Sequence, residues 1–117
     1  MVKDNLIQNK TFEFSIKIIS LYKRLIERKE FVLSKQLLRS GTSIGANVEE
    51  ALAGQTKKDF IAKMSVASKE ARETKYWLRL LDRSQLVKVD CSIHLKEIEE
   101  IINILTAIVK TSQASLK

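Results

Sequence analysis

Six positive side chains share one side of a helical segment in the second half of the chain. With Lys58 as the reference and 100° per residue, all six fall within an arc of roughly 120°, whereas Asp59, Glu70 and Glu73 gather on another side. We call the six the basic stripe: Lys58, Lys69, Arg72, Lys75, Arg79 and Arg83. A solubilising helix face more often interleaves opposite charges at i and i+4, so this segregation favours a polyanionic partner.

The chemistry that the basic stripe offers is phosphate binding. Arg72 and Arg79 carry planar guanidinium groups that donate forked hydrogen bonds to a phosphate. Lys58, Lys69 and Lys75 act as point charges. Because nothing in the sequence matches a groove-reading module, we predict sequence-nonspecific contact with RNA or DNA. The competing interpretation is that some of these cations pair with Glu50 or with acids of other chains.

Small residues are dense in the segment RSGTSIGANVEEALAG, residues 39–54. Gly41 and Gly45 are four residues apart, so one face of a helix here lacks bulk and a neighbouring backbone can approach closely. Each glycine within a helix costs about 0.5 to 1 kcal/mol relative to alanine. Packing against a neighbour must offset that cost.

A polar stripe adjoins these glycines. Ser43, Asn47 and Glu50 lie one above the other at i, i+4 and i+7. Buried amides and carboxylates need hydrogen-bond partners, and we expect cations of the third helix to supply them, namely Lys69, Arg72 and Lys75. We interpret the stripe as a structural polar network; a ligand-binding face is the alternative.

Residue types that carry catalysis or bind metals are scarce. The chain has one histidine, His94, and one cysteine, Cys91, so the two Glu-x-x-His pairs of a di-iron bundle are excluded. Neither a zinc-ligand spacing nor a Gly-rich phosphate loop is present. We expect His94 to be partly buried and hydrogen-bonded, and Cys91 to be a small packing residue. We predict no enzyme activity, metal, cofactor or small-molecule substrate.

The composition indicates which elements position these residues. The 117 residues include no proline, three glycines and 30% charged residues, which suits long helices in one all-α domain spanning residues 1–117. No segment has the ~20 apolar residues of a membrane span, and the N-terminus lacks a signal-peptide pattern. With a single cysteine and a net charge of +7, we expect a soluble cytoplasmic protein without a membrane partner.

Helical periodicity predicts four amphipathic segments. They cover residues 9–30 (or 11–30), 32–53, 57–83 and 91–110. Thr56 with Asp59 resembles a capping box for the third, and Asp90 is the N-cap candidate of the fourth. Beyond residue 110 the tail TSQASLK loses the pattern, and we expect it to fray. Short connections favour an antiparallel up-down-up-down four-helix bundle.

The first helix is apolar over more of its surface than one core face requires. Phe12, Ile16 and Ile19 form a second stripe beside the core stripe, and together the two cover roughly 220° against the ~100° of one core face. Trp77 lies about 100° from the core stripe of the third helix. Large apolar side chains outside the core are typical of subunit interfaces, so we predict a homo-oligomer with these four residues at the interface.

A close resemblance to a known family runs through residues 39–81, RSGTSIGANVEEALAGQTKKDFIAKMSVASKEARETKYWLRLL. The matching positions are Ser43, Ile44, Asn47, Glu50, Phe60, Glu70, Trp77 and Leu81. The block resembles a bacterial family encoded by intervening sequences within 23S ribosomal RNA genes, whose members are sometimes labelled ribosomal proteins. The first and fourth helices match in length and pattern, while Gly45 and Ala51 stand where many members carry Pro and Gly.

The resemblance implies an antiparallel four-helix bundle that is homo-oligomeric, often a pentamer, with no established catalytic activity. A related group, the accessory variability determinants of diversity-generating retroelements, is similar in fold and binds nucleic acid and a reverse transcriptase through a basic surface. We therefore predict a non-catalytic protein that binds RNA or DNA. The alternative is a protein–protein assembly or adaptor module without nucleic-acid binding.

Overall fold

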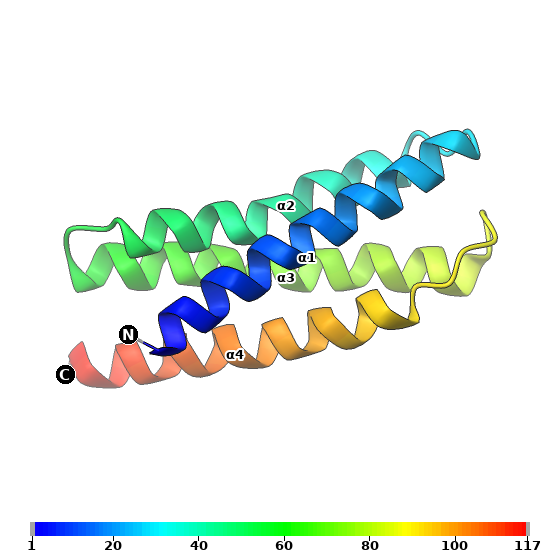
Figure 1. Cartoon of the computed structure of the whole chain (residues 1–117). Helices are drawn as coiled ribbons and strands as arrows, with labels where there is room; N and C mark the ends of the chain where they lie inside the picture. The colour runs from blue at the N-terminus through cyan, green and yellow to red at the C-terminus, as the bar shows by residue number, and fades with distance from the viewer. Residues whose placement is uncertain (1, 117) are drawn as a thin grey trace.

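Four helices make up the chain in the computed structural model, which describes the backbone of residues 2–116 and the side chains of residues 6–116. They are α1 (Val2–Glu27), α2 (Leu33–Leu52), α3 (Lys57–Ser84) and α4 (Ser92–Leu116). No strand occurs in residues 2–116, which confirms the all-α class. The helices form a four-helix bundle with extents of 49 × 21 × 21 Å (Figure 1).

Each helix packs against its neighbours in the chain, and α4 returns to α1 (Figure 1). Gln8 near the start of α1 donates to Glu49 near the end of α2 at 3.0 Å. The α1–α4 seam is the least closely packed of the four, and ion pairs bridge it. Lys10 lies 3.0 Å from Glu100, and Lys17 lies 2.6 Å from Glu97.

The connection between α1 and α2 is built by a buried carboxylate. The predicted first helix ends near Glu30, but α1 ends at Glu27 and Lys29 adopts a positive φ of 65°. Glu30 then turns back, and its carboxylate accepts hydrogen bonds from the backbone N–H groups of Leu33 and Ser34 at 3.0 and 2.6 Å. These N–H groups have no partner within a helix, so Glu30 caps the start of α2.

The other helix ends agree only in part with the sequence pattern. Thr56 accepts a hydrogen bond from the Asp59 N–H at 3.0 Å, which confirms the predicted cap of α3. Asp90 lies two residues before α4 and accepts from the Ser92 N–H at 2.9 Å. The prediction that the first helix starts at residue 9 or 11 is wrong, because α1 starts at Val2. The prediction that the tail frays is wrong for residues 111–116, which belong to α4, and Lys117 lies outside the described residues.

The glycines of α2 face α1. A Cβ added to Gly41 would come within 2.8 Å of the Ile18 side chain, and one added to Gly45 would lie 3.4 Å from the Thr11 carbonyl oxygen. Both glycines are buried. The small-residue face therefore lets α1 approach α2 closely, as the sequence predicts.

We predict opposite effects for alanine at the two glycines. Gly41→Ala forces the Ile18 side chain to move and should lower the free energy of unfolding by about 1–3 kcal/mol. Gly45→Ala meets only ordinary contact distances and should raise it by up to about 1 kcal/mol, because alanine favours the helix. Urea unfolding of both variants checks this; a Gly41→Ala protein as stable as Gly45→Ala would contradict the close approach.

Candidate nucleic-acid interface

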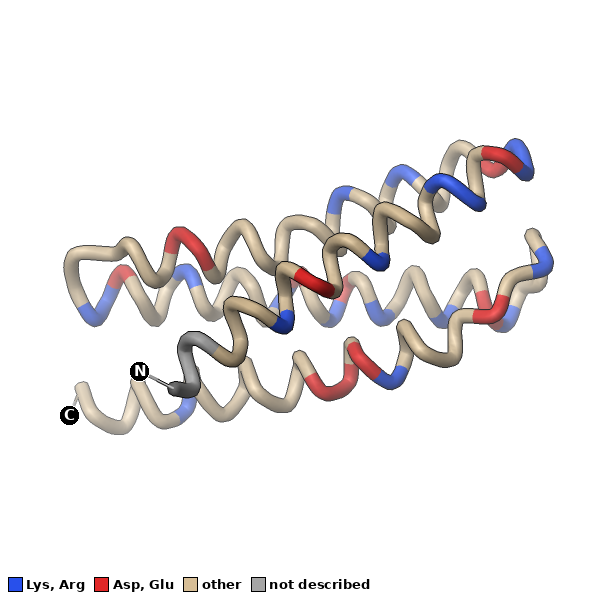
Figure 2. The backbone as a smooth tube through the Cα atoms, in the orientation of Figure 1, with Lys and Arg blue, Asp and Glu red and all other residues tan. Residues whose placement is uncertain are grey.

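The basic stripe runs along α3, where Lys and Arg recur over the length of the helix (Figure 2). The exposed members are Lys58, Lys69, Arg72, Arg79 and Arg83. Among residues 6–116, none of these five has a carboxylate within ion-pairing distance. The structure thus leaves most of the predicted phosphate-binding cations in contact with solvent.

Lys75 differs from the other members of the stripe. It is half-buried between α3 and α4, and its Nζ lies 2.6 Å from a carboxylate oxygen of Glu99. Arg72 also turns toward α4, and its Nη2 donates to the Thr106 hydroxyl at 3.4 Å. Lys75 is therefore neutralised by an acid within the described chain, although its partner is Glu99 and not Glu50.

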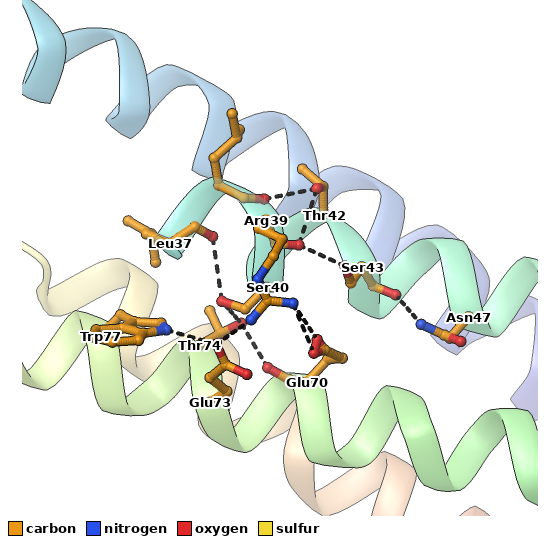
Figure 3. A network of polar contacts seen from close by, with 11 residues as sticks. Leu37, Arg39, Ser40, Thr42, Ser43, Asn47, Glu70, Glu73, Thr74 and Trp77 are labelled. Atoms are coloured by element: carbon orange, nitrogen blue, oxygen red, sulfur yellow. Dashed lines mark hydrogen bonds and ion pairs between the residues drawn. The ribbon is translucent and has the colours of Figure 1, made fainter. Parts of the chain in front are cut away.

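Two acids of α3, Glu70 and Glu73, face α2 instead. Arg39 of α2 pairs with Glu70 at 3.1 Å and also with Glu73 (Figure 3). The Trp77 indole N–H donates to the same Glu73 carboxylate at 3.0 Å. These hydrogen bonds, first that from Trp77 and then that from Arg39, lower the pKa of Glu73, and the bond to Glu73 is the main cause of the raised pKa of Arg39. Sequence reasoning found the separate cluster of acids but missed Arg39 as their partner.

A buried hydroxyl pair lies beside this cluster. Thr74 donates to the Glu70 carbonyl at 2.8 Å, and its hydroxyl is hydrogen-bonded to the Ser40 hydroxyl across the α2–α3 interface at 2.9 Å (Figure 3). Both hydroxyl residues are buried, so the bond fixes the register of the two helices. Sequence reasoning missed this pair, because spacing within one helix does not identify its partner on another.

The polar stripe of α2 does not reach the cations that we expected. Ser43 donates to the Arg39 carbonyl of its own helix at 2.6 Å, and Asn47 donates to the Ser43 carbonyl at 2.8 Å (Figure 3). Glu50 is exposed and pairs with Lys63 at 2.8 Å. The predicted network with Lys69, Arg72 and Lys75 is therefore wrong, because α2 and its own carbonyl groups satisfy the two half-buried side chains.

The outward side of α1 carries the predicted apolar face. Phe12, Ile16 and Ile19 are 62%, 49% and 41% exposed, so the helix buries its other side and leaves these residues uncovered by the chain. Trp77 is half-buried at the edge of the core. Its ring lies edge-on to the exposed Tyr76, with centroids 5.2 Å apart, a neighbour that sequence reasoning did not single out.

Both residues with reactive side-chain chemistry are buried. Burial raises the pKa of the Cys91 thiol to about 11, which keeps it protonated and agrees with a packing residue. His94 lies against α1 and is buried, whereas we expected it to be partly buried. Its Nδ1 has no hydrogen-bond partner among the described residues. Within residues 6–116, no three His, Cys, Asp or Glu side chains lie together as a metal site.

Comparison with known proteins identifies the family. The family of 23S rRNA-intervening sequence proteins matches residues 3–107. The chain belongs to this family. A crystal structure of a protein with unknown function from the S23 ribosomal protein family of Bacteroides thetaiotaomicron is 48% identical, with a TM-score of 0.88, and the match covers 92% of this chain and 98% of that chain. No curated protein matches the chain, and none of its described helices is long and apolar enough to cross a membrane.

We predict that His94 makes the stability of this family member depend on pH. Burial, with the nearby charge of Arg24, lowers the pKa of His94 below the ordinary value of 6.5. The unfolded chain therefore takes up a proton at a higher pH than the folded protein, and the free energy of unfolding falls as the pH drops below about 6.5.

His94→Leu should flatten this dependence between about pH 7 and pH 5, where most carboxylates remain ionised. The measurement is urea unfolding of both proteins at several pH values. Parallel curves for the wild type and His94→Leu would contradict the prediction.

Proposed function

We propose that this protein is a non-catalytic cytoplasmic homo-oligomer of antiparallel four-helix bundles that binds RNA or DNA through the basic stripe, without sequence preference. The observation that carries the proposal is the division of charge on α3. Glu70 and Glu73 are engaged by Arg39, whereas five cations of the stripe remain exposed. Phosphates are the partner that such a row of cations attracts most generally.

Self-association through α1 leaves the basic stripe accessible. Within the described chain α1 contacts α2 and α4, and α3 contacts the same two helices, so α1 and α3 lie diagonally across the bundle. A second copy seated on Phe12, Ile16 and Ile19 therefore approaches from the side opposite α3. Trp77 lies on α3 outside the arc of the basic stripe, so its contact with the α1 face of a neighbouring copy would be head-to-tail and could close into a ring such as a pentamer.

Several stripes in one oligomer would raise the affinity for a long polyanion. Each stripe alone offers a few salt-sensitive contacts. When one nucleic-acid chain spans two subunits, the second contact becomes intramolecular and the effective affinity rises. A weak site on each subunit is therefore sufficient for function in the oligomer.

The second candidate function is a protein–protein assembly or adaptor module, favoured by the exposed apolar face of α1. In that case the face binds a different protein and the stripe has no ligand. Pull-down after nuclease treatment separates the two candidates, because an adaptor keeps its protein partners and a nucleic-acid-binding protein loses partners that are tethered by RNA or DNA.

Charge reversal tests the nucleic-acid interface. The double variant Lys69→Glu with Arg79→Glu should weaken binding to unrelated RNA and DNA oligonucleotides about equally. It should also reduce the steepness of the salt dependence by roughly 1.4 to 1.8 in log–log slope, since two phosphate contacts are lost. Fluorescence anisotropy between about 50 and 200 mM salt measures both effects.

The matched control reverses two exposed cations outside the stripe, Lys35 on α2 and Lys96 on α4, and so makes the same change in net charge. It should retain most of the affinity and the salt slope. Equal loss in the two double variants, or no binding by the wild type at low salt, would rule out the stripe as the interface.

Polar substitutions test the oligomer. Phe12→Glu with Ile16→Glu should shift the mass measured by light scattering toward the 13.4 kDa of one chain, because charges on the outward face of α1 oppose its burial. Leu86→Glu with Ile93→Glu, at residues 62% and 65% exposed elsewhere, should leave the mass unchanged. A wild-type mass of one chain at micromolar concentration overturns self-association.

A further inference from the structure

A pocket of about 170 Å³ opens between α3 and α4. It is lined by Ser65, Ser68, Arg72, Thr106, Val109 and Lys110. Arg72 is the one member of the basic stripe in this lining. The pocket therefore interrupts a row of surface cations with a recess in which several polar groups converge.

The lining has the composition of an oxyanion site. Among the described residues it offers a guanidinium, an ammonium and three hydroxyl groups, and no carboxylate. About two turns before Thr106, α4 carries an acid on the same seam, Glu99, but Lys75 pairs with it at 2.6 Å. Positive charge and O–H donors without an opposing acid favour a phosphate over a cation or a neutral ligand.

The hydroxyl groups of α3 in this pocket are available to a ligand. Several buried or half-buried hydroxyls elsewhere in the bundle donate to a carbonyl four residues earlier, as Thr42 does at 2.7 Å and Thr74 at 2.8 Å. Ser65 and Ser68 are half-buried and make no such bond within residues 6–116. Thr106 accepts the 3.4 Å bond from Arg72, which holds the guanidinium at the edge of the recess.

The pocket is continuous with the basic stripe. At 100° per residue, Ser65 and Ser68 fall inside the arc of roughly 120° that the six cations occupy. The exposed Lys69 lies one helical turn after Ser65, about 40° around the helix axis. A phosphate held in the recess would therefore lie in the path of a polyanion bound along the stripe.

We propose that this recess binds one phosphate group, held by Arg72 and Lys110 and by the hydroxyls of Ser65 and Ser68. The group comes from the backbone of a bound nucleic acid, an assignment that rests on the proposed function, or from free phosphate. The pocket then fixes the register of the polyanion on α3, while the remaining cations supply attraction that depends little on position.

Inorganic phosphate is the first probe. Phosphate, compared with chloride at equal ionic strength, should give saturable amide shifts in the heteronuclear NMR spectrum, centred on residues 65–72 and 106–110. Ser65→Ala with Ser68→Ala leaves the charge unchanged and places a strong helix former at both positions. It should weaken phosphate binding about tenfold, the size expected for losing hydrogen bonds to a charged group. The control Ser20→Ala, at an exposed position on α1, should have no effect.

An oligonucleotide is the second probe. Arg72→Gln should weaken binding about tenfold, and Arg79→Gln, which removes the same charge outside the pocket, about two- to threefold. Phosphate should compete with the oligonucleotide in the wild type more than chloride does at equal ionic strength, and this difference should vanish in the double serine variant.

Each outcome bears on the pocket separately from the proposed function. Saturable phosphate shifts that the double serine variant loses support the pocket. Shifts that are absent, or equal in all proteins, overturn it even when the oligonucleotide binds. Phosphate binding without oligonucleotide binding overturns the proposed function and leaves the recess as a site for free phosphate.

Discussion

The close approach of α1 and α2 at Gly41 sets the spacing on which the other contacts of the bundle depend. A side chain at this position would come within 2.8 Å of Ile18, so the absence of a Cβ lets α2 sit deep against α1. On its other side α2 then presents Arg39 and Ser40 to α3. The buried hydrogen bond between Thr74 and Ser40 couples the position of α3 to that of α2 (Figure 3).

This register also determines how charge is divided on α3. Because Arg39 faces Glu70 and Glu73, these two acids of α3 are turned toward α2, and the exposed cations of the basic stripe lie on another side of the helix. Arg39 is largely exposed, and surface ion pairs contribute only about 0 to 1 kcal/mol each. These ion pairs therefore contribute little to stability. Their main effect is that Arg39 neutralises Glu70 and Glu73, so these carboxylates compete less with a polyanion for the basic stripe.

The sequence predicts the helices better than their ends and partners. Apolar periodicity identifies four helices, and the Thr56 cap follows from its spacing to Asp59. The end of α1 depends on the positive φ of Lys29 and on the hydrogen bond from the Ser34 N–H to the Glu30 carboxylate. Neither feature can be detected from the spacing of apolar residues in the sequence. The 100° spacing predicts five exposed cations of the basic stripe correctly, but it does not show that Lys75 packs against α4 and pairs with Glu99, because that contact depends on the neighbouring helix. The hydrogen-bond partner of Ser43 could not be predicted from spacing, because a hydroxyl in a helix can bond the backbone of its own helix as well as a neighbouring helix.

Because α1 and α3 lie diagonally across the bundle, the chain presents two chemically different surfaces on opposite sides. A helix that packs against two neighbours keeps one side outward, and in this chain the outward side of α1 is apolar while that of α3 is cationic. In the proposed oligomer, burial of the apolar side of α1 with the basic stripe still exposed would place several cationic surfaces in one particle. If both proposals hold, each added subunit would increase the local concentration of cations, so self-association would strengthen the attraction to a polyanion.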